Sequence, residues 1–406
     1  MSATQTVTQT VADTFPTTLC VGQPDIVYHP DEGKFRARTA RRLAADPALP
    51  QRSLPDNFPP QVDGPIVWEG KDWKDESQWV YNLTDEQLAE IDRALAHFDS
   101  LDKPLGYINK ETFPLPTLSA ELWKLAEVLY NGRGFFVLRE IPIDKYSRRE
   151  LAIIYAGLSS HVGSGRGRQD ATNAVLAHIK DLRATHAHEK GGIGNAAYTT
   201  DKQVFHTDIG DLIALLSIQT SAHGGVSRLS SAGRVYNEIA KTRPDLITVM
   251  KDNWPLDRFG ANPGYVERPV LYNEDGHIVI QYSRRQFVGY NAQVRSANIP
   301  PITEAQAEAL DMIHFYAEKY SLELNFKKGD IQYINSMGLL HARDAFTDDE
   351  EHTRHLVRLW LRNDELAWKT PKPLEETWKK LYSVPPEDQR FPLEPEIRRT
   401  AGGATK

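Results

Sequence analysis

Five stretches of the chain repeat their hydrophobic residues every three or four positions, which is the spacing of one face of an α-helix. In the first stretch, Leu88, Ile91 and Leu95 share that face, and Thr84 with Gln87 forms the capping box that starts a helix. The expected helices cover residues 84–101, 118–130, 147–158, 233–247 and 303–320.

Other stretches are short and apolar, or alternate apolar with polar residues, which is typical of β-strands. The expected strands cover residues 133–141, 173–179, 212–220, 277–283, 322–326, 331–335 and 355–361. Residues 224–231 are expected to turn into the helix that follows, and His341 is expected in a loop. The pattern favours a mainly β fold with flanking helices, of the α+β class.

The N-terminal part of the chain lacks a core-forming pattern. Residues 1–20 are rich in Thr, Gln and Ala, and six prolines between 45 and 65 favour an extended arm over a packed element. We therefore expect a tail and arm over 1–80, one folded domain over 81–370 and an extension over 371–406.

Composition narrows the class of protein. A chain of 406 residues that is 40% apolar can bury a large core, and we find neither a secretory signal nor a stretch apolar enough to span a bilayer. Cys20 is the single cysteine, so no intrachain disulfide is possible and the cytosol is expected. A net charge of -7 argues against a nucleic-acid partner, and the basic run at 35–44 is expected to be a solvated helix face.

The segment VFHTDIGDLIA at 204–214 carries the strongest candidate chemistry. His206 and Asp208 stand two positions apart where an apolar strand begins, and such side chains leave an extended backbone on the same face. With one distant histidine they would form the triad that holds Fe(II) in non-haem oxygenases. The pattern alone is weak, because a capped turn with a surface histidine has the same sequence.

Other histidine patterns compete with this one. The same His-x-Asp spacing begins at His29, in a proline-punctuated stretch, and at His97, in a predicted helix where positions two apart point in different directions. His186 and His188 form a His-x-His pair, but glycines follow where a cupin-type site has a glutamate on the same strand. We expect those two to be ordinary loop histidines.

Five histidines follow residue 250 and are candidates for the third ligand. His314 lies in a predicted helix and His277 beside a turn, whereas His341 follows a strand, as a ligand at the edge of a barrel does. The alternative for His341 is a loop histidine hydrogen-bonded near Asp344.

The last predicted strand carries Arg354 and Arg358 on one face, while Val357 and Leu359 share the other. The apolar face must pack against protein, so the arginines point into solvent or into a polar cavity. Guanidinium groups at this spacing suit the carboxylates of small molecules. An exposed edge strand protected by its charges is the alternative.

Several segments near the candidate site keep two interpretations. The glycine-rich stretches 159–170 and 186–200 are either lids or surface excursions. Side chains of QYSRRQF either approach a substrate or pack across strands, which we favour; they are Tyr282, Arg284, Arg285 and Phe287.

Taken together, the motifs resemble the Fe(II)- and 2-oxoglutarate-dependent dioxygenases of the taurine dioxygenase and clavaminate synthase type, in a fungal-looking branch. The resemblance covers roughly residues 115–365. It depends on FHTD at 205–208, GGVS at 224–227, GDIQYINSMGLLH at 329–341 and RHLVR at 354–358. It implies a double-stranded β-helix (jelly-roll) core and a role in secondary metabolism.

The resemblance also implies roles for single residues. His206, Asp208 and His341 match the ligands of Fe(II), which leave positions for 2-oxoglutarate and O2. Arg354 matches the arginine that binds the far carboxylate of 2-oxoglutarate, and Arg358 matches a second arginine that meets an acidic substrate group or assists the cosubstrate.

Ser227 stands where the family has a threonine after Gly-Gly-Asp, so its hydroxyl is expected to help hold the same carboxylate. Here Val226 replaces the acidic residue and serine replaces threonine, which makes this the weakest match.

The expected reaction oxidises a C–H bond of a small metabolite, and a carboxylate-bearing compound is the first candidate. The carboxylate of Asp208 favours hydroxylation, desaturation or ring closure over halogenation, for which relatives carry a small residue there. Two other functions stay open from sequence: a cupin-like metal enzyme that needs no 2-oxo acid, and a non-catalytic jelly-roll binding protein. The sequence specifies neither the substrate nor the oligomeric state.

Overall fold

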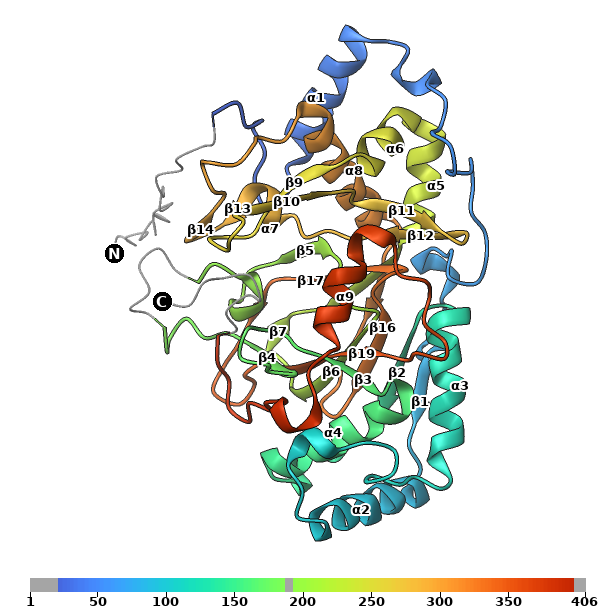
Figure 1. Cartoon of the computed structure of the whole chain (residues 1–406), viewed down its shortest axis with the longest axis vertical. Helices are drawn as coiled ribbons and strands as arrows, with labels where there is room; N and C mark the ends of the chain where they lie inside the picture. Colours follow the sequence, from blue (N-terminus) through green and yellow to red (C-terminus); the bar gives the residue numbers. More distant parts are fainter. Residues whose placement is uncertain (1–20, 187–192, 398–406) are drawn as a thin grey trace, which may run out of the picture.

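The computed structural model describes residues 21–186 and 193–397, and two β-sheets form its centre (Figure 1). The larger sheet has the strand order β1-β2-β16-β6-β19-β3, with β4 also paired to β19, and the smaller has the order β15-β8-β17-β5. Only β1 and β2 pair in parallel within these sheets.

The larger sheet consists of β1 (Val80–Asn82), β2 (Phe135–Arg139), β3 (Gly165–Gly167), β4 (Leu176–Lys180), β6 (Leu212–Gln219), β16 (Ile331–Asn335) and β19 (His355–Arg362). The smaller consists of β5 (Gln203–His206), β8 (Ser227–Ser231), β15 (Leu322–Leu324) and β17 (Leu339–Arg343). Two-stranded pairs are β7 (His223–Gly224) with β18 (Phe346–Thr347), β9 (Trp254–Asp257) with β10 (Tyr265–Arg268), β11 (Leu271–Glu274) with β12 (His277–Ile280), and β13 (Gly289–Tyr290) with β14 (Gln293–Val294).

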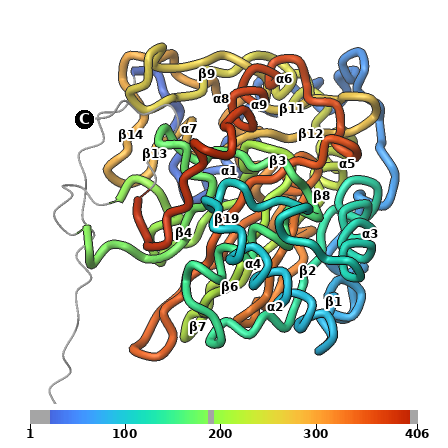
Figure 2. The backbone as a smooth tube through the Cα atoms, turned by 60° about the horizontal axis from the view of Figure 1, so that its bottom comes forward, coloured from blue at the N-terminus to red at the C-terminus, as the bar shows by residue number. Residues whose placement is uncertain are grey.

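The helices are α1 (Glu32–Ala45), α2 (Asp85–Ser100), α3 (Leu118–Asn131), α4 (Arg148–Val162), α5 (Ala232–Thr242), α6 (Pro244–Lys251), α7 (Arg285–Val288), α8 (Glu304–Lys319) and α9 (Glu375–Leu381). Helices α2, α3 and α4 lie at one end of the molecule, and α1, α5, α6 and α8 lie at the other (Figure 1). The tube view also places α2, α3 and α4 together, beside β1 and β2 (Figure 2).

Alternation of side chains along the strands builds these layers. In β6, Leu212 and Ala214 belong to the core cluster that includes α2, α3 and α4, whereas Ile213 belongs to a second cluster between the two sheets. In β17, Leu339 joins that second cluster, and Leu340 joins a third with α5, α6 and α8. The order is therefore helices, larger sheet, smaller sheet, helices.

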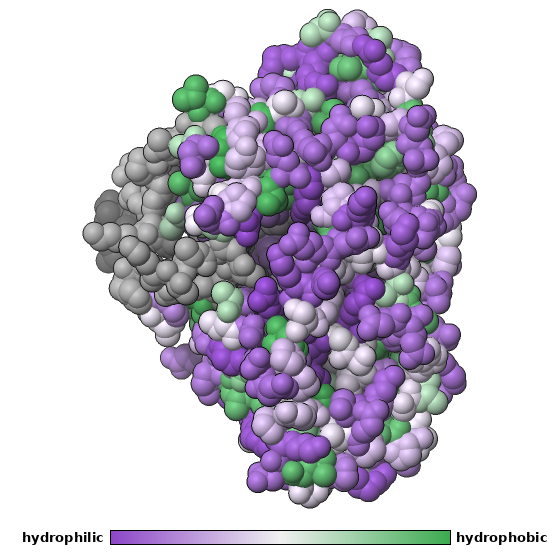
Figure 3. Space-filling model, viewed as in Figure 1, coloured by the Kyte–Doolittle hydropathy of each residue, from purple (hydrophilic) through white to green (hydrophobic). Residues whose placement is uncertain are grey.

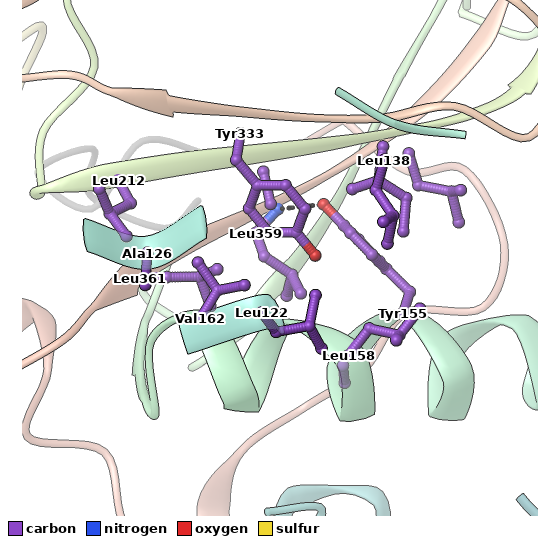
Figure 4. Close-up of a cluster of buried hydrophobic side chains, with 14 of the residues drawn as sticks. Leu122, Ala126, Leu138, Tyr155, Leu158, Val162, Leu212, Tyr333, Leu359 and Leu361 are labelled. Carbon is purple, nitrogen blue, oxygen red and sulfur yellow. Dashed lines mark hydrogen bonds between the residues drawn. The ribbon is translucent and has the colours of Figure 1, made fainter. Parts of the chain in front are cut away.

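Figure 4 shows how α3 and α4 cover the larger sheet. Leu122 and Ala126 come from α3, and Tyr155 reaches from α4 toward β19. The Tyr155 hydroxyl accepts a hydrogen bond from the Leu359 backbone at 3.2 Å and donates one to the Val357 carbonyl at 3.1 Å. A buried hydroxyl needs such partners, so this tyrosine fixes the helix against the strand.

The helix expected over 233–247 and the turn expected over 224–231 both differ from the sequence prediction. The single helix expected over 233–247 is wrong, because Arg243 interrupts it and Pro244, which has no N–H to donate, opens a new helix at its first position. The turn expected over 224–231 is also wrong beyond its first residues. Gly224 and Gly225 turn with φ values of +74° and +71°, and β8 then begins at Ser227.

Residues 159–170 form neither a lid nor a surface excursion. Helix α4 continues to Val162, and β3 pairs with β19. A Cβ on Gly167 would lie 3.0 Å from Leu381 Cγ, so the glycine allows close packing against the C-terminal extension. In the second glycine-rich stretch, residues 187–192 lie outside the described part and 196–198 form a short 3-10 helix.

The basic run at 35–44 lies in a helix, as expected, but only part of it is solvated, because Arg36 and Arg41 are exposed whereas two other arginines face α8. Arg38 is 2% exposed, and its guanidinium donates to Asp311 Oδ2 at 2.7 Å. Arg42 forms an ion pair with the buried Glu308. The prediction was wrong for Arg38 and Arg42, because periodicity did not reveal the acidic residues of α8 that receive them.

The face of the molecule seen in Figure 3 is mostly hydrophilic, with apolar residues scattered over it. Across residues 21–186 and 193–397, we find no helix with the length and hydropathy needed to cross a bilayer.

Candidate active site

His206 and His341 are direct partners across two antiparallel strands of the smaller sheet, β5 and β17. Their ring centroids lie 4.1 Å apart. Asp208 follows two residues after His206, and one ligand atom from each of the three side chains lies within 4.8 Å of the others. It is the one group of at least three histidine, cysteine or acidic side chains this compact in the described part of the chain.

The strand register explains the convergence. The sequence prediction placed His341 in a loop, but it lies inside β17, because β17 pairs with both β5 and β8. Past the end of β5, Ser336 Oγ accepts a hydrogen bond from the Asp208 N–H at 3.1 Å and donates one to the Asp208 carbonyl at 3.2 Å. The backbone of the acidic residue is therefore fixed from the β16–β17 connection.

Hydrogen bonding orients the His206 ring. Its Nδ1 lies 2.8 Å from the Val204 carbonyl, which requires a proton on Nδ1. Nε2 is then the unprotonated nitrogen, and it lies 3.8 Å from Asp208 Oδ1. The side-chain amide nitrogen of Gln203 lies 3.1 Å from the same Nε2. The sequence analysis did not single out Gln203.

Electrostatics keep the three groups in the forms that bind a cation. Burial lowers the pKa of His206 and lowers that of His341 to about 3, so both imidazoles are neutral at pH 7. Burial alone would raise the pKa of Asp208, but Arg358 and the two histidines bring it below its ordinary value. Two neutral imidazoles and one carboxylate are the donor set suited to Fe(II).

Known proteins resemble this chain in sequence and in fold. Residues 101–360 match the family described as taurine catabolism dioxygenase TauD, TfdA family. This chain belongs to the TauD/TfdA family. A taurine hydroxylase-like protein from Stachybotrys chartarum is 36% identical over 344 residues, which cover 83% of this chain and 89% of that protein. The FR-33289 synthase of Streptomyces rubellomurinus is 24% identical over 74% of this chain and 90% of its own length.

Among solved structures, asparagine oxygenase in complex with Fe(II), 2S,3S-3-hydroxyasparagine and succinate has a TM-score of 0.52. It is 12% identical and covers 70% of this chain and 93% of its own. That similarity concerns the fold. As a TauD/TfdA enzyme, the chain is a non-haem iron dioxygenase whose cofactor is Fe(II) and whose cosubstrate is 2-oxoglutarate.

The residues present fit both groups. The compact His206, Asp208 and His341 set supplies two nitrogens and an oxygen for the metal. For the cosubstrate, Arg354 is 5% exposed and its Nη1 atom has no hydrogen-bond partner among the described residues. Burial, with Arg343 nearby, lowers the pKa of Arg354 to about 9, so a bound anion would stabilise its charge.

Arg343 is a second buried guanidinium that the sequence analysis missed. It stands two positions after His341 in β17, hence on the same strand face, and its Nε atom also lacks a partner. Arg343 and Arg354 lie 4.7 and 5.4 Å from the centroid of the Phe346 ring. The His-x-Arg spacing was the signal available in the sequence.

The structure brings the GGVS motif beside these arginines. Ser227 is the cross-strand partner of Arg343 in β8, and a Cβ on Gly225 would lie 3.1 Å from Arg354 Nε. The Ser227 hydroxyl donates to Gln332 Oε1 at 3.2 Å. The motif thus lies beside two buried arginines, and the Ser227 hydroxyl already has a protein partner.

Arg358 faces the interior but contacts a protein carboxylate. Its Nη1 donates to Asp208 Oδ2 at 2.6 Å and its Nε donates to Gln169 at 2.9 Å. Trp360 Nε1 donates to the same Asp208 oxygen at 3.0 Å. The interpretation of the last strand as an exposed edge is therefore wrong, because its arginines are buried.

A cavity of about 710 Å³ opens onto His206 and Asp208. Gln169, Arg358 and Trp360 line it, as do residues of α9. Four side chains of QYSRRQF were named in the sequence analysis. Arg285 lines the cavity, and Arg284 is buried and bound to Asp311. Tyr282 and Phe287 are core residues.

The competing histidine patterns stay apart from this site. His29 packs its ring against Tyr28, and His97 is exposed on α2. His186 lies 3.2 Å from the Leu182 carbonyl through Nδ1, and His188 lies outside the described residues.

Proposed function

We propose that the enzyme couples oxidative decarboxylation of 2-oxoglutarate to oxidation of a C–H bond in a small metabolite. The product class is a hydroxylated, desaturated or ring-closed compound. The observation that carries the proposal is the meeting of His206, Asp208 and His341 at one point, together with the buried Arg354, whose Nη1 atom has no hydrogen-bond partner among the residues that the structure describes. Hydroxylation has additional support from the asparagine oxygenase structure, which is a complex with 2S,3S-3-hydroxyasparagine and succinate.

In this proposal His206, Asp208 and His341 hold Fe(II), and Arg354 binds the far carboxylate of 2-oxoglutarate. Bound Fe(II), with 2-oxoglutarate and O2, supplies the conversion to succinate and CO2 and the oxidising equivalents for the substrate. The Ser227 hydroxyl in β8 would help to hold the same carboxylate. Arg358 orients Asp208 through their 2.6 Å ion pair.

The strand order supports a double-stranded β-helix as the core. Along the chain, β4, β6, β16 and β19 belong to the larger sheet, and β5, β8, β15 and β17 to the smaller. Counted in chain order as eight strands, they give sheet orders of 1-8-3-6 and 2-7-4-5. Such alternation joins two sheets into one closed unit. Of the tail and arm over 1–80 and the extension over 371–406, the described residues 21–80 and 371–397 would flank it, and the remaining residues of both segments lie outside the described part of the chain.

We propose that the enzyme binds a small-molecule substrate and that neither a nucleic acid nor a membrane is its partner. We also propose that it acts in the cytosol. A net charge of -7 supports the first exclusion. The enzyme would act in secondary metabolism, in keeping with its similarity to the FR-33289 synthase and the fungal protein.

An anaerobic titration tests the proposal. Adding Fe(II) and 2-oxoglutarate to the wild-type protein should produce a metal-to-ligand charge-transfer band, and His206→Ala should abolish it. His97→Ala is the matched control, because His97 belongs to the same His-x-Asp pattern but is exposed on α2. With O2 admitted, succinate should form.

A metal site without the band would indicate a cupin-like enzyme that uses no 2-oxo acid. Absence of iron uptake altogether would indicate a binding protein. Either result contradicts the proposed reaction.

A further inference from the structure

The lining of the cavity that opens onto His206 and Asp208 is rich in arginine. Five arginines line the cavity, namely Arg168, Arg258, Arg268, Arg285 and Arg358. Of these, Arg358 is paired with Asp208. Across the described residues, no ion pair joins a carboxylate to Arg168, Arg258 or Arg268.

The acidic residues of the cavity do not compensate for these charges. Asp257 is fully buried and accepts hydrogen bonds from the Phe259 and Ser296 backbone N–H groups, each at 2.7 Å. Glu376 is exposed and forms its ion pair with Lys380. Leaving aside the metal ligand Asp208, the residues that line this cavity of about 710 Å³ therefore carry more positive than negative charge. Low-dielectric walls concentrate such a potential inside a cleft.

Arg268 is held by several hydrogen bonds to protein acceptors. Its Nη1 donates to the carbonyls of Gln281 and Pro269, each at 3.0 Å, and its Nη2 donates to Gln281 Oε1. All these acceptors are neutral, so they orient the guanidinium without neutralising it. A cation fixed in this way is preorganised for a bidentate contact with an oxyanion.

The same contacts place Arg268 next to the iron site. The Gln281 amide that holds Arg268 also donates to the Asp208 carbonyl at 3.5 Å. One side chain therefore separates the guanidinium from the backbone of a metal ligand. Val266, two positions earlier in β10, lines the cavity as well, which shows that this strand face is turned toward the cavity.

We propose that Arg268 is a binding site for an anionic group of the substrate, assisted by the fields of Arg258 and Arg168. The substrate class is thus an organic anion, with a carboxylate, sulfonate or phosphonate group that reaches Arg268 in the cavity. This inference rests on the proposed function, and it replaces Arg358 with Arg268 as the residue that recognises the acid.

Matched probes test the charge requirement. The wild-type enzyme with Fe(II) and 2-oxoglutarate, held without O2, is titrated calorimetrically with methanesulfonate and with the neutral dimethyl sulfone. We expect binding of the anion at least about ten-fold tighter than that of the sulfone. Acetate and methylphosphonate in separate titrations distinguish carboxylate and phosphonate from sulfonate as the preferred group.

Variants locate the site. Arg268→Gln should weaken binding of the preferred anion about ten-fold or more, and Arg268→Lys should retain part of it. Arg36→Gln is the control, because Arg36 is an exposed arginine on α1, with 76% side-chain exposure. The charge-transfer band should stay unchanged in all three variants, which shows that the proteins are folded and bind iron and 2-oxoglutarate.

Two results would overturn the inference. One is equal binding of the anion and the sulfone, and the other is undiminished anion binding in Arg268→Gln. Both leave the band intact, whereas failure of the proposed function removes the band from the wild-type enzyme itself. The two failures are therefore distinguishable.

Discussion

Arg358 Nη1 lies 2.6 Å from Asp208 Oδ2, so the acidic member of the proposed triad is also one half of a buried ion pair. Trp360 Nε1 donates to that same oxygen at 3.0 Å. Two donors occupy Oδ2, whereas Oδ1 is the oxygen that lies 3.8 Å from His206 Nε2. The carboxylate is thus held with one oxygen toward β19 and the other toward the histidines.

Because Arg358 holds Oδ2 of Asp208 and leaves Oδ1 facing the histidines, we predict that Arg358 affects the affinity of the enzyme for Fe(II). Arg358→Gln should weaken Fe(II) binding about 10- to 100-fold, because it removes the charge that holds Asp208 ionised and in place. Trp360→Phe removes one neutral donor and should have a smaller effect. Anaerobic Fe(II) titration measures both. If Arg358→Gln binds iron like the wild type and instead loses 2-oxoglutarate, the arginine serves the cosubstrate.

The proposed role of Arg354 predicts that it discriminates between 2-oxo acids with and without a second carboxylate. Arg354→Gln should weaken 2-oxoglutarate binding about 100-fold, since a buried charge-assisted contact is lost. Binding of 2-oxobutyrate, which has no second carboxylate, should change less than about three-fold. The intensity of the charge-transfer band measures both affinities. An equal loss for the two acids would show that the substitution disturbs the metal site rather than a carboxylate contact.

Local sequence signals identified most of the fold, and the exceptions have physical causes. Capping residues such as Thr84 and Ser147 correctly marked helix starts. Strand β8 was missed because Arg228 and its neighbouring serines give no apolar alternation, although cross-strand pairing to β17 buries the strand. Pattern reasoning has no access to such pairing, which depends on residues more than one hundred positions apart.

The candidate site shows the same division. The i, i+2 spacing of His206 and Asp208 was sufficient to propose a shared cation, and His341 was found by its place after a strand. Arg268 was not found, because nothing near it in sequence indicates iron; Gln281 brings it there through a long-range contact. Residues that act through tertiary contacts leave little periodic signal.

A buried histidine pair predicts how stability depends on pH. His178 Nδ1 and His355 Nε2 lie 2.8 Å apart, and burial, followed by the charge of His178, lowers the pKa of His355 to about 3. Between that value and 6.5 the unfolded chain binds a proton that the folded chain does not. Folding free energy from this group is therefore fully present above pH 6.5 and is lost as the pH falls.

The His355→Gln variant should flatten that dependence by about 1 kcal/mol per pH unit between pH 6 and pH 4. Urea unfolding at several pH values measures it, with the exposed His97→Gln as the comparison. A variant whose stability falls with pH as steeply as that of the wild type would contradict the assignment.

One buried carboxylate, that of Asp211 just before β6, connects the C-terminal helix α9 to strand β19 through hydrogen bonds. Trp378 Nε1 donates to Asp211 Oδ1 at 2.6 Å, and Arg362 Nη1 donates to Oδ2 at 2.7 Å. Burial raises the pKa of Asp211 to about 6 despite these donors. Removing a donor should therefore leave a costly unsatisfied oxygen.

Trp378→Phe should lower the free energy of unfolding by about 1–3 kcal/mol more than the matched control Trp73→Phe. Both substitutions remove the same atoms, but the Trp73 Nε1 atom is buried without a hydrogen-bond partner among the described residues. Urea unfolding at pH 7 measures the difference. Helix α9 and Arg168 line the same cavity, so a displaced α9 should alter how the substrate is held there. In Trp378→Phe, but not in Trp73→Phe, we therefore expect less substrate to be oxidised for each succinate formed. Equal losses of stability in the two variants would show that packing, and not the bond to Asp211, holds the helix in place.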